Sequence, residues 1–329
     1  MRIAIDAMGG DLAPKEIVAG VLAAASQYSD AELILVGHEA QIRSCLSSEL
    51  PVNVRIVHAE DRILADDEPV RAVRRKKDAS MVVAARLVKE GQAEAMISAG
   101  NTGALMAAGL LIIGRIPGIE RPALAPMLPT MDGAGVLALD LGANMDAAPE
   151  HLLQYAVMGS IYRSKVDGME KPRVGLLNVG TEAMKGNEVS KAAYALIEQA
   201  PIHFVGNVEA RDVFARNCDV LVCDGFVGNV MLKTMEGTAS TIFGALKQEF
   251  TRTTFTKLAA AVLKPGLSRF KKKLDYTEHG AAPLLGINGL CLKSHGSSDA
   301  NAIKNGVRQA IHALKNNLVG SIAAEISGK

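Results

Sequence analysis

The sequence predicts an α/β protein of three layers, in which a mostly parallel sheet is covered by helices on both faces. Short apolar runs alternate with longer helical patterns along most of the 329 residues. The apolar runs are continuous rather than alternating, which is typical of strands that are buried on both faces. Strand–helix alternation implies right-handed crossovers, and such crossovers join parallel strands.

Eight segments are predicted strands, because each is a short, mostly apolar run. They are 3–6, 33–37, 54–57, 95–98, 135–140, 174–178, 203–206 and 220–224. Helices are predicted where longer stretches carry a helical pattern. They include 16–27, 81–90 and 191–198, and a last helix at about 299–318.

The composition excludes several classes of protein. With 49% hydrophobic residues and no Trp, the chain can form a large core that is mostly aliphatic. A net charge of +1 gives no overall field for nucleic acid. The four cysteines form no C-x-x-C pair, so we expect core thiols and no metal site. The chain begins with a predicted strand rather than a signal peptide, and no apolar run reaches about 18 residues, so we expect a cytoplasmic protein.

Polar or glycine-rich turns follow five of the predicted strands. Ligands of open α/β sheets bind outside the carboxyl ends of the strands. If the turns lie on one edge of one sheet, they form a continuous polar cleft. The turns are 6–11, 98–103, 140–144, 178–181 and 224–229.

The turn at 98–103, with the sequence SAGNTG, is a candidate phosphate-binding loop. Its glycines let backbone N–H groups converge, and the helix that follows adds partial positive charge at its N-terminus. Asn101 and Thr102 can donate further hydrogen bonds. An ordinary capped helix start is the alternative. The loop is neither a Walker A motif nor G-x-G-x-x-G, which disfavours classical nucleotide binding.

Three polar side chains elsewhere are candidates for chemistry. Lys185, beside Gly186 and Asn187, places a cation at a strand end, where it can bind phosphate or stabilise an oxyanion; a solvated loop lysine is the alternative. Asn229, at the end of the turn 224–229, is a neutral donor that can reach the cleft. His295 has an ordinary pKa near physiological pH, so it is either a general base or a structural histidine.

The segment at about 236–276 is predicted to be a helical insertion. Phe255, Leu258 and Val262 recur at helical spacing, and 265–266 (Pro-Gly) is expected to stop that helix. A second apolar stripe, formed by Leu267, Phe270 and Leu274, follows beside three lysines. The hairpin is therefore expected to contact anionic lipid or an acidic partner, or to pack in a dimer. Its candidate contact residues are Phe255, Leu258, Val262, Leu263, Lys271, Lys272 and Lys273.

Six motifs in order resemble the bacterial acyl-ACP:phosphate acyltransferase (PlsX) family. They are IAIDAMGGD at 3–11, SAGNTGA at 98–104, DLGAN at 140–144, NVGTEAMKGNE at 178–188, DGFVGNVMLK at 224–233 and KSHGSSDANA at 293–302. The resemblance covers essentially the whole chain. One departure is HGAA at 279–282, where relatives often have YGGA.

The resemblance implies a single catalytic domain over 1–329, similar to isocitrate dehydrogenases and phosphotransacetylases, with the hairpin inserted. It implies a homodimer attached peripherally to the inner face of the cell membrane. The implied reaction moves a fatty acyl group from acyl carrier protein to inorganic phosphate, and the acyl phosphate passes to the next acyltransferase of phospholipid synthesis.

The resemblance also implies catalytic roles for Lys185 and Asn229. No metal or organic cofactor is needed, because phosphate is a nucleophile and a thioester is already activated. Lys185 would neutralise phosphate, Asn229 would donate to the oxyanion, and Lys271 to Lys273 would attract the acidic carrier protein. The expected substrate-binding residues are Ser98, Gly100, Asn101, Thr102, Gly103, Asp6, Gly9, Gly10, Asn144, Asn187 and His295.

Three other functions remain open from the sequence. A CoA-dependent phosphate acetyltransferase shares the fold and the phosphate chemistry. A decarboxylating dehydrogenase needs a cluster of metal-binding aspartates, and the sequence has no such motif. A non-catalytic scaffold at the membrane surface needs only the hairpin.

Overall fold

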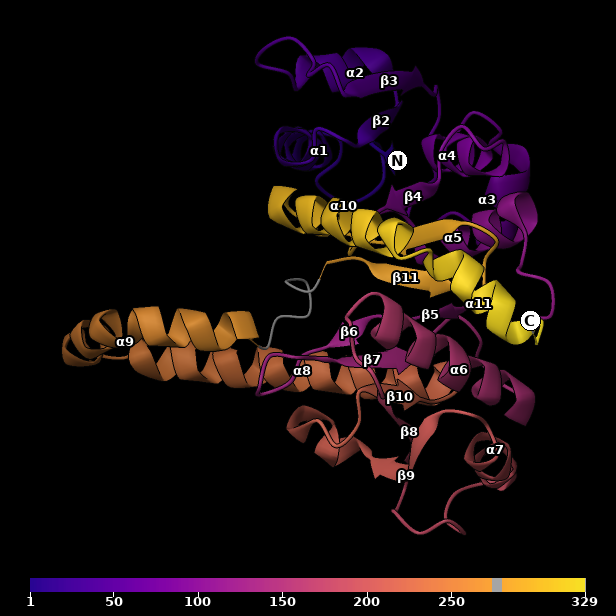
Figure 1. The fold of residues 1–329 in the computed structure, drawn as a ribbon. Helices are drawn as coiled ribbons and strands as arrows, with labels where there is room; N and C mark the ends of the chain where they lie inside the picture. Colours follow the sequence, from indigo (N-terminus) through magenta and orange to yellow (C-terminus); the bar gives the residue numbers. More distant parts are fainter. Residues whose placement is uncertain (274–279, 329) are drawn as a thin grey trace.

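The computed structural model describes residues 1–273 and 280–328, with only the backbone described at 268, 269 and 271–273. Leu274 and His279, which the sequence analysis singled out, therefore lie outside the described residues. Figure 1 shows two halves of the molecule, one above the other, with a long helical hairpin projecting to one side.

The upper half is built on a seven-stranded sheet. Its order is β3-β2-β1-β4-β12-β11-β5. The first five of these strands run parallel, and β11 is antiparallel to both of its neighbours. The strands are β1 (Arg2–Asp6), β2 (Glu32–Gly37), β3 (Val54–His58), β4 (Ala95–Ser98), β5 (Ala123–Leu124), β11 (Ala282–Leu285) and β12 (Leu290–Lys293).

The lower half is built on a five-stranded sheet of order β6-β7-β10-β8-β9. All of its pairs are parallel except β6 with β7. The strands are β6 (Met127–Leu128), β7 (Val136–Leu139), β8 (Arg173–Asn178), β9 (His203–Glu209) and β10 (Val220–Val222).

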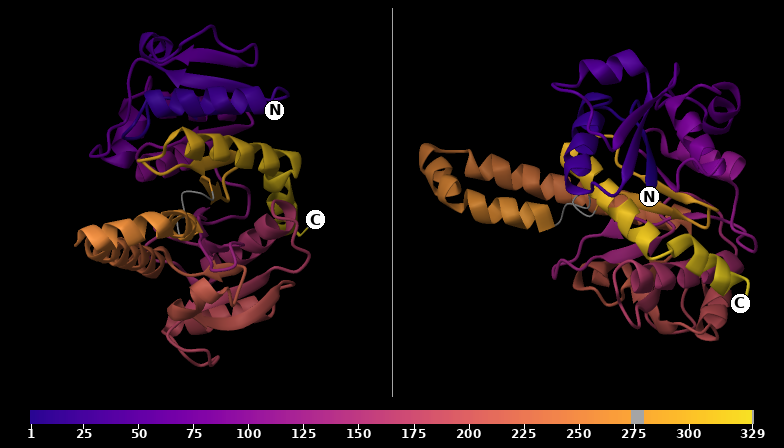
Figure 2. Two further views of the ribbon diagram at one scale, coloured as in Figure 1. Left: turned by 90° about the vertical axis from the view of Figure 1, so that its left-hand side faces the viewer. Right: turned by 45° about the horizontal axis from the view of Figure 1, so that its top comes forward.

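Helices connect the strands and cover both sheets (Figures 1 and 2). Those of the upper half are α1 (Lys15–Gln27), α2 (Glu39–Ser44), α3 (Pro69–Arg75), α4 (Ser80–Lys89), α5 (Thr102–Ala108) with the π-helical turn Gly109–Ile113, α10 (Ala300–Lys315) and α11 (Leu318–Ile326). Those of the lower half are α6 (Pro149–Lys165), α7 (Glu188–Glu198), the 3-10 turn Ala210–Ala215, α8 (Gly225–Phe250) and α9 (Thr254–Lys273).

The α/β class and the eight predicted strands are confirmed, but the prediction of one sheet was wrong. The turns 6–11 and 98–103 follow strands of the upper sheet, whereas 140–144, 178–181 and 224–229 follow strands of the lower one. The chain changes sheets between β5 and β6, which pair with β11 and β7. Two-residue strands carry no measurable periodicity, so the change of sheet has no clear signal in the sequence.

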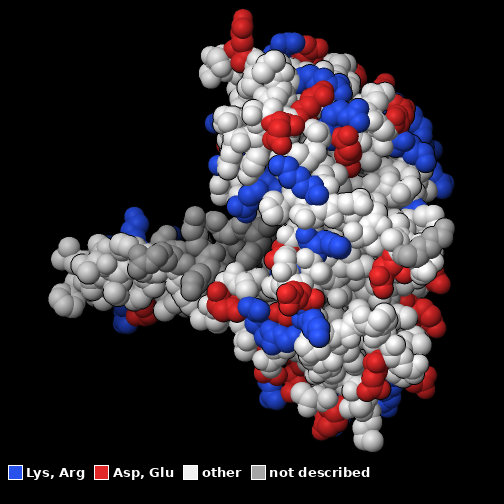
Figure 3. Space-filling view, in the orientation of Figure 1, with Lys and Arg blue, Asp and Glu red and all other residues white. Residues whose placement is uncertain are grey.

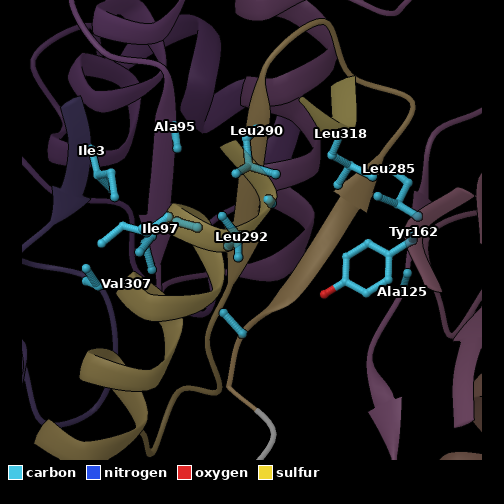
Figure 4. Packing of buried hydrophobic residues seen from close by; sticks show 14 of the residues in the cluster. Ile3, Ala95, Ile97, Ala125, Tyr162, Leu285, Leu290, Leu292, Val307 and Leu318 are labelled. Carbon is cyan, nitrogen blue, oxygen red and sulfur yellow. The ribbon is translucent and has the colours of Figure 1, made fainter. Parts of the chain in front are cut away.

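A shared aliphatic core joins the halves. The largest buried cluster contains Ile97 and Leu292 of the upper sheet together with Leu137 of the lower sheet. Figure 4 shows Tyr162 of α6 beside Leu285 of β11, where the two halves meet. The core is mostly aliphatic, as the composition predicts.

The predicted last helix, 299–318, divides in two. Asp299 caps α10, since its carboxylate accepts a hydrogen bond from the Ala302 N–H at 2.8 Å. Asn317 has a φ of 48°, in the left-handed region, so the helix ends before it and α11 begins at Leu318.

Helices α8 and α9 form the predicted hairpin, which extends away from both halves (Figures 1 and 2). The expected stop at 265–266 was wrong, because α9 continues through Pro265. Packing on α8 supports the helix beyond this point: the rings of Phe243 and Phe270 lie 6.1 Å apart, centroid to centroid. No helix in the described residues is long and apolar enough to cross a membrane.

Candidate active site

A cavity of about 350 Å³ lies where turns from both sheets meet. It is lined by Thr102 after β4, Gly142 after β7, Asn229 at the start of α8, and Lys293 and His295 at the end of β12. Part of its wall is aliphatic. That part is formed by Leu124, Pro126, Met127, Leu128, Leu141, Leu232, Ala281 and Ala282. The cavity therefore offers both polar groups and apolar surface to a ligand.

Two glycines place Asn229 at this cavity. The first turn of α8 is capped by Asp224, whose carboxylate accepts from the Val227 N–H at 2.9 Å. A Cβ atom on Gly225 would lie 2.6 Å from the Asn144 carbonyl oxygen, and one on Gly228 would lie 2.1 Å from the Asp140 carbonyl oxygen. Only glycine lets α8 approach the turn 140–144 so closely.

The buried carboxylate of Asp140 holds that turn together. It accepts hydrogen bonds from the backbone N–H groups of Leu124, Ala143 and Asn144 at 3.2, 3.1 and 2.6 Å. Burial raises the pKa of Asp140, and these donors oppose the rise. The side-chain amide of Asn144 donates to Asp140 at 3.1 Å and to the Pro122 carbonyl at 2.7 Å. The amide of Asn144 thus donates to one acceptor in the turn and to one outside it.

A second buried carboxylate, Asp6, supports the loop at 98–103. Ser80 and Ser98 each donate a hydroxyl to it at 2.6 Å, and the Met8 N–H donates at 3.2 Å. Ser98 in turn accepts from the Gly100 N–H at 3.0 Å. Burial raises the pKa of Asp6, while the three donors favour the ionised form. Asp6 and Ser98 therefore fix the loop backbone from below.

The glycines after β1 allow the Asp6 turn and the loop at 98–103 to touch. A Cβ on Gly9 would lie 2.4 Å from the Asp6 carboxylate and 2.8 Å from the Gly100 nitrogen. Gly10 has a φ of 106°, which an L side chain rarely adopts. Gly9 and Gly10, two of the four glycines predicted to bind substrate, thus have a clear structural role.

Within the loop, the side chain that lines the cavity is Thr102. Asn101 caps α5 by accepting from the Ala104 N–H at 3.0 Å. Its amide nitrogen lies 3.0 Å from the Ala65 carbonyl and 3.4 Å from two others in 64–67. Gly103 packs on α3, since a Cβ there would lie 2.7 Å from Pro69. The loop is therefore built mainly by Asn101 and Gly103, and Thr102 faces the cavity.

The side chain of His295 is oriented by its neighbour Ser297. Its Nδ1 atom accepts from the Ser297 N–H at 3.3 Å and lies 2.8 Å from the Ser297 hydroxyl. The neutral ring therefore carries its proton on Nε2. Burial, and then the nearby Lys293, lower the pKa of His295, which favours this neutral form.

The structure does not bring Lys185 to the cavity that Asn229 lines. Lys185 is exposed on the loop after β8, where Asn178 donates to its carbonyl at 3.1 Å and Asn207 donates to the Glu182 carbonyl at 2.8 Å. Asn187 caps α7 by accepting from the Ser190 N–H at 2.9 Å.

A second, mostly aliphatic cavity of about 690 Å³ borders this loop. Gly186 and Asn187 lie at its wall, with Val227 and Met231 of α8. Asn229 lines the first cavity and these two α8 residues line the second, so α8 contributes to both.

Sequence reasoning missed Lys293, which lines the first cavity. The sequence feature that could have pointed to Lys293 is the run Leu290–Lys293, a short apolar strand that ends in a lysine directly before the Ser-His turn. Lys233 and Glu236, also missed, line the same cavity as an ion pair of 2.7 Å.

Three of the four cysteines are buried free thiols: Cys218, Cys223 and Cys291. Burial raises the pKa of Cys218 and of Cys291 to about 12, so both thiols stay protonated at neutral pH. Among residues 1–273 and 280–328, no group of three His, Cys, Asp or Glu side chains is placed to hold a metal ion.

Comparison with solved structures supports the fold. The EutD phosphotransacetylase from Staphylococcus aureus matches with a TM-score of 0.59 at 17% identity, covering 96% of this chain and 94% of that one. A phosphotransacetylase from Streptococcus pyogenes matches with a TM-score of 0.56 at 18% identity, covering all of this chain and 94% of that one. At these identities the likeness concerns the fold alone.

Sequence comparison identifies the family. Residues 1–320 match the family model described as fatty acid synthesis protein. The phosphate acyltransferase of Geobacillus thermodenitrificans is 58% identical over 326 residues, 99% of each chain, and that of Brevibacillus brevis is 60% identical over 310 residues, 94% of this chain and 92% of the other. The chain therefore belongs to the fatty acid synthesis protein family, together with the proteins named phosphate acyltransferase.

Proposed function

We propose that the protein transfers a fatty acyl group from acyl carrier protein to inorganic phosphate, giving acyl phosphate for phospholipid synthesis. The observation that carries the proposal is the lining of the 350 Å³ cavity, which combines polar and aliphatic side chains. Thr102, Asn229, Lys293 and His295 suit an anion, and the aliphatic wall suits the first part of an acyl chain. The relatives are named phosphate acyltransferase, which supports phosphate as the acceptor and an acyl group as the transferred group.

The chemistry needs two bond changes. A phosphate oxygen attacks the thioester carbonyl carbon, and the resulting tetrahedral intermediate expels the carrier thiolate as the C–S bond breaks. Phosphate at neutral pH is already an anionic nucleophile, so a general base is not required. The enzyme holds the reactants in attack geometry and stabilises the oxyanion.

Asn229 and Thr102 are suited to these tasks, because neither side chain has a hydrogen-bond partner among the described residues. In the proposal Asn229 donates to the oxyanion and Thr102 donates to phosphate. His295 lines the cavity, and it is not needed as a base. Lys185 does not line this cavity, so its proposed catalytic role requires its exposed loop to bring the ammonium group to the bound phosphate.

The hairpin supports the choice of acyl carrier protein as the donor. The segment 250–274 contains seven Lys and Arg residues and no Asp or Glu. A carrier protein is acidic, so a basic projecting hairpin would guide its approach. Lys271, Lys272 and Lys273 remain proposed contacts, with side chains outside the described atoms.

The hairpin also supports peripheral membrane contact. Phe255, Leu258, Val262 and Leu263 are 81, 67, 81 and 53% exposed. On the face seen in Figure 3 the described part of the hairpin is mostly uncharged, whereas the rest of the surface carries both signs. We propose that these side chains enter the inner face of the cell membrane.

Exposed apolar residues along α8, such as Val230 and Ile242, support the proposed homodimer.

The function is tested by trapping the product. Purified protein is supplied with acyl-ACP and phosphate, and acyl phosphate is trapped as hydroxamate and identified by mass spectrometry. Product that depends on both substrates is expected, with acetyl-CoA turned over far more slowly than acyl-ACP. Preference for acetyl-CoA would instead favour a phosphate acetyltransferase, and the lack of product from either donor would favour the scaffold.

Replacing Phe255, Leu258 and Val262 with serine is expected to release the protein from vesicles of phosphatidylglycerol. Each exposed apolar side chain that enters a membrane contributes about 1.5–3 kcal/mol, so the loss is about tenfold or more per residue. Flotation with vesicles measures it. A matched variant with Val52 and Met131, two exposed residues outside the hairpin, changed to serine should still float. Equal binding by both variants would place the contact elsewhere.

A further inference from the structure

Lys293 stands at the meeting point of three parallel strands. It is the last residue of β12 and pairs in register with Ser98 of β4. Ile97 of β4 pairs with Ile5 of β1, so Asp6 is the next residue along and binds Ser98 at 2.6 Å. Asp6, Ser98 and Lys293 therefore form one row at the carboxyl ends of β1, β4 and β12.

The ammonium group of Lys293 is held in place by backbone carbonyls. It donates to the Ser294 carbonyl and lies 3.4 Å from the Ala99 carbonyl. An ammonium group has three N–H donors, so one remains available to a ligand. Lys293 lines the cavity while most of its side chain is covered.

The other cations are less suited to bind an anion here. Lys233 lines the cavity, but its charge is paired with Glu236 at 2.7 Å. Lys185 is exposed on the loop after β8 and does not line the cavity. Lys293 has no carboxylate within ion-pair distance among the described residues, although Asp6 and Asp11 attract it from further away.

We propose that Lys293 is the cation that binds the phosphate substrate, with one N–H directed to a phosphate oxygen between Asn229 and Thr102. This rests on the proposed acyl transfer to phosphate. A partly desolvated ammonium gains more from an incoming anion than an exposed one does, because the local dielectric is low. Two fixed carbonyl contacts also hold the group before phosphate arrives, so little side-chain entropy is lost on binding.

The alternative is a purely structural role, in which Lys293 only compensates the negative charge of the buried Asp6 carboxylate. That role predicts a loss of stability when the charge is removed, without a selective effect on phosphate. The KM for phosphate therefore distinguishes the two roles, whereas a measurement of stability alone does not.

The pH dependence gives an independent readout. Burial lowers the pKa of Lys293 to about 8, against the attraction of Asp6 and Asp11. His295 on its own turn, and Lys233 and Glu236 on α8, also act on this region. The cation is present below pH 8 and is lost as pH rises through that value, so the KM for phosphate should increase on the alkaline side.

The test compares Lys293→Met, Lys293→Arg and the exposed control Lys15→Ala, with hydroxamate-trapped product at saturating acyl-ACP. A hydrogen bond from a charged donor predicts a KM for phosphate about 10- to 100-fold higher in Lys293→Met, with the KM for acyl-ACP within about threefold. Lys293→Arg should recover part of the affinity and lose the alkaline rise, since arginine stays protonated. Lys15→Ala should match wild type.

An unchanged KM for phosphate in Lys293→Met, or an alkaline rise that persists in Lys293→Arg, would overturn the proposal. If Lys293→Met does not fold, the pH profile of Lys293→Arg decides alone. If wild type makes no acyl phosphate, the proposed function fails separately. Titration of inorganic phosphate into wild type and Lys293→Arg by calorimetry, at pH 7 and pH 9, then still tests whether Lys293 binds it.

Discussion

Asn229→Ala is expected to lower kcat for acyl phosphate formation about 100- to 1,000-fold, which is the usual cost of losing one oxyanion donor. Asn229 lies over Gly142, since a Cβ there would be 3.5 Å from the Asn229 amide carbon. Its amide is free to turn towards the oxyanion, whose charge develops in the transition state and not in the bound substrate. The KM for phosphate should therefore change far less than kcat.

The control for this variant is Thr234→Ala, on the same helix. The Thr234 hydroxyl donates to the Val230 carbonyl, and the residue lines the second cavity. It should keep kcat within about threefold. An Asn229→Ala enzyme whose loss appeared only in the KM for phosphate would show that Asn229 binds the ground state, and the oxyanion role would then be wrong.

Much of the fold could be predicted because its main strands are long enough to carry a pattern. The run 33–36 is aliphatic throughout and is buried in β2. The division into two sheets could not be predicted, because it depends on β5 and β6, which have two residues each. Whether such short strands form, and which sheet they join, depends on pairing with segments far apart in the chain and not on local propensity.

The candidate site was predicted at the level of turns rather than of side chains. Asn101, Asn144 and Asn229 read alike in the sequence as polar residues of conspicuous turns. In the structure the side-chain amides of Asn101 and Asn144 donate to nearby backbone carbonyls, and that of Asn229 does not. Whether a side-chain amide finds a hydrogen-bond partner within the protein depends on where distant backbone segments lie. A single sequence does not predict those positions. Lys293 was missed because a lysine at a strand end is ordinarily a solvated one.

Lys185→Ala is expected to fold and to bind vesicles normally but to lose kcat about 100- to 1,000-fold. Its loop is fixed through Asn178 and Asn207, which bind backbone carbonyls of the segment and do not depend on the lysine side chain. Removing the ammonium therefore takes away a charge while the loop keeps its shape. Circular dichroism, flotation and the hydroxamate assay measure the three properties.

Lys191→Ala is the matched control, because Lys191 is an exposed lysine on α7, directly after the same loop. A general effect of surface charge on carrier docking would lower kcat/KM for acyl-ACP in both variants and would weaken with salt. Loss of a catalytic cation would affect Lys185→Ala alone and would persist at 0.5 M salt. Activity of Lys185→Ala within about threefold of wild type would leave Lys293 and Asn229 as the residues that carry the chemistry, since Lys185 lies outside their cavity.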